Sequence, residues 1–79
     1  MAGFPGHEEH RRRAEWWLAS RQVVGVTLAD LVASGEAENV TIRVLSENGR
    51  SFVVTADRRG NRVNVDVVDG RVSRIDGIY

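Results

Sequence analysis

The segment VTADRRGNRVNVDV, residues 54–67, decides the fold of this 79-residue chain. In its second half apolar and polar residues alternate, so Val63, Val65 and Val67 point to one face of a strand and their neighbours to the other. Its first half is polar and charged, is centred on a glycine and has no period, which is typical of a connecting segment. We therefore expect an exposed loop that runs directly into a strand at residues 62–68.

Two helices are expected ahead of the sheet. Over residues 8–20, Ala14, Trp17 and Leu18 recur at helical spacing and form one apolar face. Trp16 and Trp17 are adjacent, so a helix cannot bury both on one narrow face. One tryptophan should pack on the domain, and the other should lie at an edge or on a partner surface.

The second helix should be short. Thr27 suits its N-cap, with Asp30 three residues later near the free amides. Gly35 is placed to end the helix in the left-handed conformation. Residues 23–26, just ahead of it, read as a short extended piece.

Further strands are indicated on both sides of the decisive segment. Residues 40–45 alternate, and the Asn-Gly pair at 48–49 is a strong hairpin signal, with a return strand at 51–54. An Asp-Gly turn at 69–70 precedes a last strand at 71–75. The apolar residues of that strand do not alternate strictly, which indicates an edge position.

These elements predict an α+β fold in one small domain over residues 8–79, preceded by a flexible tail at 1–7. The N-terminal helix and one short helix would pack on a three- to four-stranded sheet, with the exposed loop before the strand at 62–68.

Two strand orders fit this pattern. In one, the strands at 40–45 and 62–68 are parallel neighbours joined by the loop. In the other, residues 40–45, 50–56, 62–68 and 71–76 form an antiparallel meander with the helices on one face.

The composition argues against several classes of function. Eleven basic and eleven acidic residues balance, so no overall field points to nucleic acid. The chain has no cysteine, which removes disulfides, thiol nucleophiles and thiolate metal ligands. No apolar run is long enough to span a membrane, and no signal-peptide core is visible. A cytosolic location is the default, although a chain already stripped of a signal would look the same.

The sequence carries no recognisable catalytic constellation. Its two histidines, His7 and His10, lie in or beside the tail, and their spacing of three differs from the i, i+4 spacing of a zinc-protease helix. No serine stands in a nucleophile elbow, and no Gly-rich phosphate loop is present. We therefore expect no enzyme, no catalytic residue, no metal and no cofactor.

Three ungapped matches, in the order of the chain, carry a resemblance to a known family. They are Val23-Val24-Gly25-x-Thr27-Leu28, Asn39-Val40-x-Ile42 and Val54-Thr55-x-Asp57-x-Arg59-x-Asn61-Arg62-Val63-x-Val65. Over residues 23–77 the chain resembles the potato inhibitor type I family, which includes eglin and the barley chymotrypsin inhibitor. The resemblance implies a serine protease inhibitor whose loop, at about residues 53–60, binds a protease as a substrate would.

The resemblance also implies roles for single residues. It places the scissile bond between Ala56 and Asp57, with Thr55 before it, and a small Ala56 suits the narrow pocket of a subtilisin- or elastase-type enzyme. Arg62, with Arg59, would tie the side chains of Thr55 and Asp57.

The chain departs from the family at several positions. Asn64 stands where the family commonly has a second loop-supporting arginine, so the support should be weaker. Gly60 replaces a larger residue, the segment at 46–53 is longer, and the Trp-Trp helix has no counterpart. The alternative is a non-catalytic interaction module on the antiparallel meander, with Trp16 and Trp17 as partner anchors.

Overall fold

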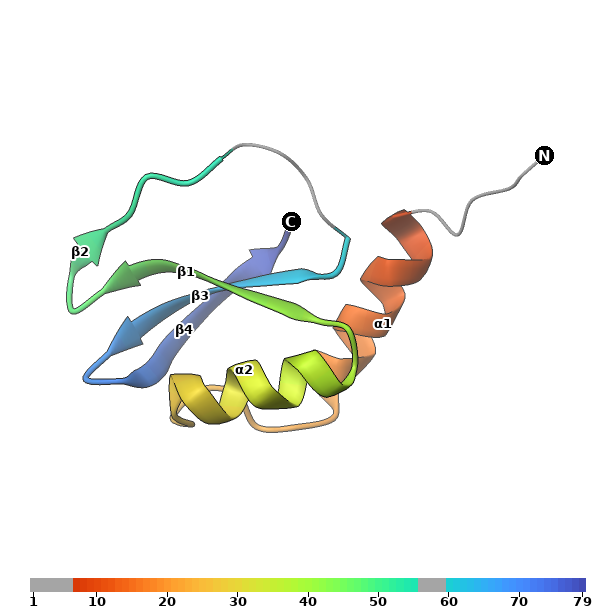
Figure 1. The fold of residues 1–79 in the computed structure, drawn as a ribbon, viewed down its shortest axis with the longest axis horizontal. Coiled ribbons are helices and arrows are strands. Elements are labelled where there is room, and N and C mark those ends of the chain that lie inside the picture. Colours follow the sequence, from red (N-terminus) through yellow and green to blue (C-terminus); the bar gives the residue numbers. More distant parts are fainter. Residues whose placement is uncertain (1–6, 56–59) are drawn as a thin grey trace.

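The computed structural model describes residues 7–55 and 60–79, which form two helices and a four-stranded mixed sheet (Figure 1). The α+β class expected from the sequence is confirmed. The expected tail lies outside the described residues except for His7, which begins the first helix. The helices are α1 (His7–Ala19) and α2 (Leu28–Ala37), and the strands are β1 (Thr41–Glu47), β2 (Arg50–Ser51), β3 (Arg62–Val68) and β4 (Arg71–Ile78).

The sheet has the order β2-β1-β3-β4, and its two central strands are parallel. The β1–β3 register runs from Thr41 opposite Arg62 to Glu47 opposite Val67. The other two pairs are antiparallel. The antiparallel meander is therefore wrong and the parallel order is the one adopted, because β3 pairs directly with β1, while β2 lies on the other edge of β1 rather than between the two.

The two predicted tight turns are present. Asn48 and Gly49 have φ values of 51° and 84°, and Asp69 and Gly70 have values of 50° and 77°. Such left-handed pairs match the twist of a two-residue hairpin. The first hairpin is short, however, because β2 consists of Arg50–Ser51 alone, so only Ser51 of the return strand expected at 51–54 pairs with β1.

The start of α2 was predicted correctly, but its end was not. Thr27 caps the helix by accepting a hydrogen bond from the Asp30 amide at 3.2 Å. The helix continues through Gly35, and the left-handed residue is Asn39, with φ of 59°. Gly35 is required for space, since a Cβ there would lie 2.5 Å from the carbonyl oxygen of Val40.

The chain between the helices is a turn rather than the expected extended piece. The Gly25 amide donates to the Val72 carbonyl at 2.8 Å, and the Val72 amide donates to the Val26 carbonyl at 2.9 Å. These two bonds fasten the interhelical connection to β4.

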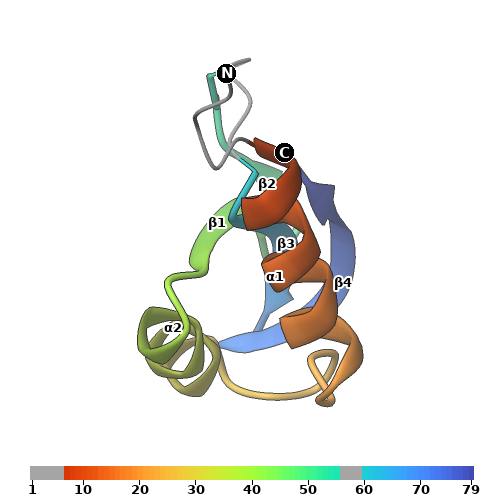
Figure 2. The ribbon, with the colours of Figure 1, turned by 90° about the vertical axis from the view of Figure 1, so that its right-hand side faces the viewer.

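The core lies between the helices and one face of the sheet. Val63, Val65 and Val67 of β3 face it, as the alternation predicted, and α1 contributes Trp17, which is fully buried. Trp16 is 60% exposed, so the two tryptophans divide as expected, and Trp17 is not available at the surface for a partner. In Figure 2 α1 lies in front of the sheet, and α2 lies at the lower left, seen nearly along its axis.

Arg21 joins the two helices. Its guanidinium lies 4.8 Å from the centroid of the Trp17 ring, and its Nε donates to the Trp17 carbonyl at 2.9 Å. Its Nη1 donates to the Ser34 hydroxyl of α2. Over the described part of the chain, neither helix is long and apolar enough to cross a membrane.

Candidate functional site

The face of the sheet opposite the helices is polar. Side chains from three strands meet on it, and they are Arg43, Ser46, Asn64, Asp66, Arg74 and Asp76. A β-bulge between Val44 and Ser46 shifts the register of β1 against β3. Because a bulge adds one residue to its strand, Ser46 comes to the same face as Arg43, which strict alternation would not allow.

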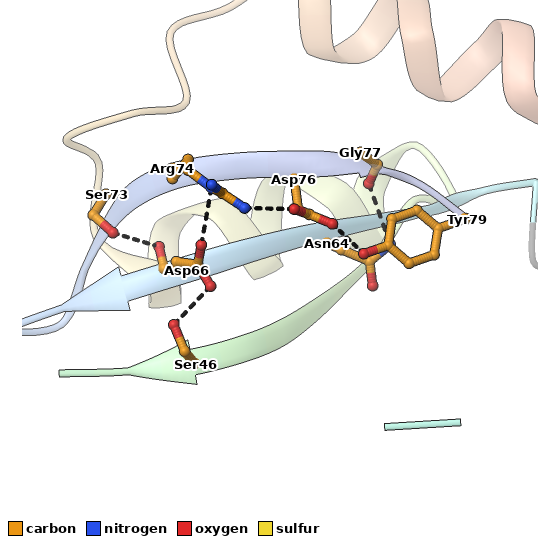
Figure 3. Close-up of polar contacts among 8 residues, drawn as sticks. All are labelled: Ser46, Asn64, Asp66, Ser73, Arg74, Asp76, Gly77 and Tyr79. Atoms are coloured by element: carbon orange, nitrogen blue, oxygen red, sulfur yellow. Dashed lines mark hydrogen bonds and ion pairs between the residues drawn. The ribbon is translucent and has the colours of Figure 1, made fainter. Parts of the chain in front are cut away.

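Asp66 of β3 connects β1 and β4 on this face, and Arg74 of β4 links it to Asp76 on the same strand (Figure 3). The Ser46 hydroxyl donates to Asp66 at 2.6 Å, and Arg74 Nε lies 3.1 Å from the same carboxylate. Arg74 Nη2 donates to Asp76 at 2.6 Å, and the Tyr79 hydroxyl donates to the second oxygen of Asp76. The hydrogen bond to Asp76 raises the pKa of Tyr79 above 10.0, with smaller contributions from burial and from the charge of Asp76.

An exposed apolar segment leaves β2 and lies on the side of β1 opposite α2 (Figure 1). The Phe52 amide donates to the Leu45 carbonyl at 2.8 Å, after which the chain departs from the sheet. Val53 is fully exposed, and Phe52 and Val54 are 44% and 39% exposed. Three consecutive exposed apolar residues on a small domain mark a candidate contact surface.

Arg43 of β1 reaches from the polar face to this segment. Its Nη1 lies 3.1 Å from the main-chain carbonyl oxygen of Thr55 and 3.4 Å from the Thr55 hydroxyl. Its Nε donates to Asn64 Oδ1 at 2.6 Å, and its guanidinium lies 5.7 Å from the centroid of the Tyr79 ring. One side chain therefore links β1, β3, the end of β4 and the departing segment.

The far end of the connection is also fastened to the domain. Asn61 Nδ2 donates to the Asn39 carbonyl at 2.9 Å, and the Thr41 amide donates to the Asn61 carbonyl at 2.8 Å. Both ends of the connection from β2 to β3 are thus bound to fixed parts of the fold.

The structure places three of the residues predicted for the reactive loop and its support. Thr55 is exposed, whereas Arg62 is 9% exposed and Asn64 is fully buried, and both lie on β3. Arg62 Nη2 donates to the Tyr79 carbonyl at 2.9 Å. Ala56, Asp57 and Arg59 lie outside the described residues.

Sequence reasoning missed two contributors to this site, Arg43 and Tyr79. The signal for Arg43 was available, since it is the one charged residue within the strand predicted at 40–45 and lies on the face opposite Val40, Ile42 and Val44. Tyr79 gave no such signal, because its role depends on the ring lying beside Arg43 and on the contact with Asp76.

A scan against protein-family models and searches of curated proteins and of solved structures found no match to this chain. Among residues 7–55 and 60–79, no group of three or more histidine, cysteine, aspartate or glutamate side chains could hold a metal ion.

Proposed function

We propose that this protein is a serine protease inhibitor of the potato inhibitor type I kind, which presents a substrate-like loop at about residues 53–60. The main support is the contact between Arg43 and Thr55. An exposed apolar segment leaves the sheet, and the Arg43 guanidinium bonds the main-chain carbonyl of its last described residue. A protease binds the main chain of an extended substrate segment. An exposed segment whose main chain is already held in place therefore favours binding.

The energetic argument rests on preorganisation. Ordering a free backbone costs about 1–2 kcal/mol per residue, which a loop held beforehand does not lose on binding. Arg43 holds Thr55 on the departing side, and Asn61 is bound to Asn39 and Thr41 on the returning side. The same attachments would keep the two new ends close after cleavage and favour religation over release.

The residue that would enter the protease pocket is Ala56, by the resemblance to the inhibitor family. Its single methyl group suits a narrow pocket and would fill a deep aromatic pocket poorly. It offers no positive charge to a trypsin-type enzyme. The proposed targets are therefore subtilisin-like or elastase-like serine proteases.

The proposal is tested by titrating subtilisin and pancreatic elastase with the full chain and following the mixture by mass spectrometry. We expect inhibition of at least one enzyme together with a single slow cut between Ala56 and Asp57. Ala56→Lys should move inhibition towards trypsin, because it supplies the charge that a trypsin-type pocket requires. Ala37→Lys, the same change at an exposed position of α2, is the matched control and should leave the target unchanged.

Two results would overturn the proposal. One is rapid cleavage of the chain at many sites without inhibition. The other is an intact chain that inhibits neither enzyme, combined with an Ala56→Lys variant that does not inhibit trypsin.

A second candidate is a non-inhibitory interaction module, which the exposure of Trp16 favours. A tryptophan that is 60% exposed on a helix, beside the exposed Arg12 and Arg13, is the type of residue that anchors protein interfaces. Under this reading, Trp16→Ala would abolish binding to a partner, and Ala56→Lys would have no effect on it.

A further inference from the structure

We propose that Arg43 is the positioning residue of the loop and that Asn64 serves to orient Arg43. This assignment rests on the inhibitor function proposed above. It adds a loop support that comes from β1, which precedes the loop in the chain. The resemblance alone implies loop support from the strand after the loop, at Arg62 and at the position of Asn64.

The pairing of the two strands explains why Arg43 and Asn64 act together. The two residues are direct partners in the parallel β1–β3 register, and both side chains lie on the polar face. Asn64 is fully buried and is held from both sides, since its amide nitrogen donates to the Gly77 carbonyl at 3.2 Å while its oxygen accepts from Arg43 Nε at 2.6 Å. Its bond to β4 therefore restricts the orientation of the amide independently of the bond to Arg43.

Arg43 can serve both neighbours because of the shape of its side chain. A guanidinium presents several donors in a rigid fork, so Nε can bond Asn64 while Nη1 bonds Thr55. The Tyr79 ring, 5.7 Å from the guanidinium carbon, adds a cation–π contact that restricts the plane of the fork. A lysine ends in a single ammonium nitrogen, which cannot bond both Asn64 and Thr55 in the same geometry.

The atom that Arg43 bonds is the reason for assigning it a role in the loop. The Thr55 carbonyl belongs to the residue immediately before the predicted scissile position, so Arg43 fixes the main chain at the last described residue ahead of that position. The second contact, to the Thr55 hydroxyl at 3.4 Å, is longer. In this arrangement Asn64 does not replace the missing family arginine directly. It holds an arginine that arrives from the neighbouring strand.

The test compares Arg43→Gln, Asn64→Ala and the double variant with Arg50→Gln, an exposed arginine of β2 that serves as the matched control. Inhibition constants, the rate of cleavage after Ala56 and NMR relaxation of the Val53 and Val54 amides are measured for each. Thermal unfolding checks that every variant is folded. We expect Arg43→Gln to weaken inhibition by about 10- to 100-fold, the value of one charge-assisted hydrogen bond, and to increase the motion of residues 53–54.

Asn64→Ala should weaken inhibition in the same direction but less. The double variant should be no weaker than Arg43→Gln, because Asn64 acts through Arg43. Arg43→Lys should behave like Arg43→Gln, which a general charge effect would not produce. The variant Arg43→Leu/Asn64→Arg moves the guanidinium to β3 and should restore part of the inhibition.

The outcomes separate this proposal from the proposed function. If the wild type inhibits and Arg43→Gln inhibits equally well with unchanged relaxation, the role of Arg43 is overturned. Additive effects of the two single variants would overturn the role of Asn64. If the wild type inhibits no protease, the inhibitor function fails, and the relaxation of residues 53–54 still decides whether Arg43 holds the segment.

Discussion

At the scale of single residues, the contact between Tyr79 and Asp76 makes the polar face sensitive to high pH. A hydroxyl that donates to a carboxylate is favoured in its neutral form, so the pKa of Tyr79 is higher in the folded protein than in the unfolded chain. The contact therefore contributes its stability below the unfolded pKa of about 10. That contribution is lost as the pH rises through the higher folded value.

Asp76→Asn should lower the pKa of Tyr79 towards 10.0, because it removes the charged acceptor that favours the protonated phenol. Tyr79 is the single tyrosine of the chain, so the absorbance of phenolate reports it alone in a pH titration. Asp69→Asn is the matched control, since it removes the same charge at a turn outside this network. An unchanged pKa in Asp76→Asn would contradict the account.

At the scale of elements, the packing of α2 against the start of β1 depends on one missing methyl group. Gly35 lies inside the helix, where glycine is less favourable than alanine by about 1 kcal/mol. Glycine is needed at this position despite its low helix propensity, because Val40, which follows the turn after α2, packs directly against Gly35. The Val40 amide donates to the Gly35 carbonyl at 2.7 Å, and the Val40 carbonyl oxygen lies 2.5 Å from the position that a Cβ would take.

Gly35→Ala should therefore destabilise the protein by about 1–3 kcal/mol, as overpacking does, although helix propensity alone predicts a gain. The free energy of unfolding is measured in denaturant. Ala33→Gly, at an exposed position of the same helix, provides the reference and should cost about 1 kcal/mol through propensity alone. A Gly35→Ala variant more stable than the wild type would show that the helix and β1 can move apart without cost.

At the scale of the whole molecule, β3 is the centre of the domain. It lies between β1 and β4, faces the core with three valines and faces the polar side with Asn64 and Asp66. The segment 52–55 contrasts with it, because after the Phe52 amide no hydrogen bond joins the backbone of Val53 or Val54 to the described part of the chain.

Hydrogen exchange should reflect this contrast. The amides of β3 are expected to exchange slowest, since they open only when the core opens, whereas the amides of Val53 and Val54 should exchange rapidly. The amide of Phe52, bonded to Leu45, is the internal control and should be slower than its two successors. Strong protection across residues 52–55 would indicate that the antiparallel pairing of β2 with β1 continues beyond Phe52.

Much of the fold could be predicted from local pattern. The alternation around Val63 identified β3, and the two turn pairs and the Thr27 cap were correct, because each depends on the chemistry of neighbouring residues. The end of α2 could not be predicted, since it depends on the approach of Val40 to Gly35. The bulges at Ser46 and in β4 bring the polar side chains together. They also arise from pairing between strands, so the local sequence carries no signal for them.

The candidate site was predictable only in part for the same reason. Thr55, Arg62 and Asn64 became candidates through the ordered match to a family, and the structure places Arg62 and Asn64 on β3 and Thr55 in contact with Arg43 of β1. The sequence marked Arg43 as the charged residue of its strand, but its partner was fixed by the parallel register, which sets it opposite Asn64. The sequence is compatible with two strand orders, and in an antiparallel meander Arg43 would have a different neighbour.

The parallel pairing of β1 with β3 also affects how the chain can fold as it is synthesised. Both helices and β1 leave the ribosome before the strands that cover them, so Trp17 and Leu31 have no complete core to enter. That core closes only when β4 emerges and brings Val72 to the same cluster. A nascent chain must therefore carry uncovered apolar surface until β4 has emerged, and this domain should fold in one event after that point rather than stepwise.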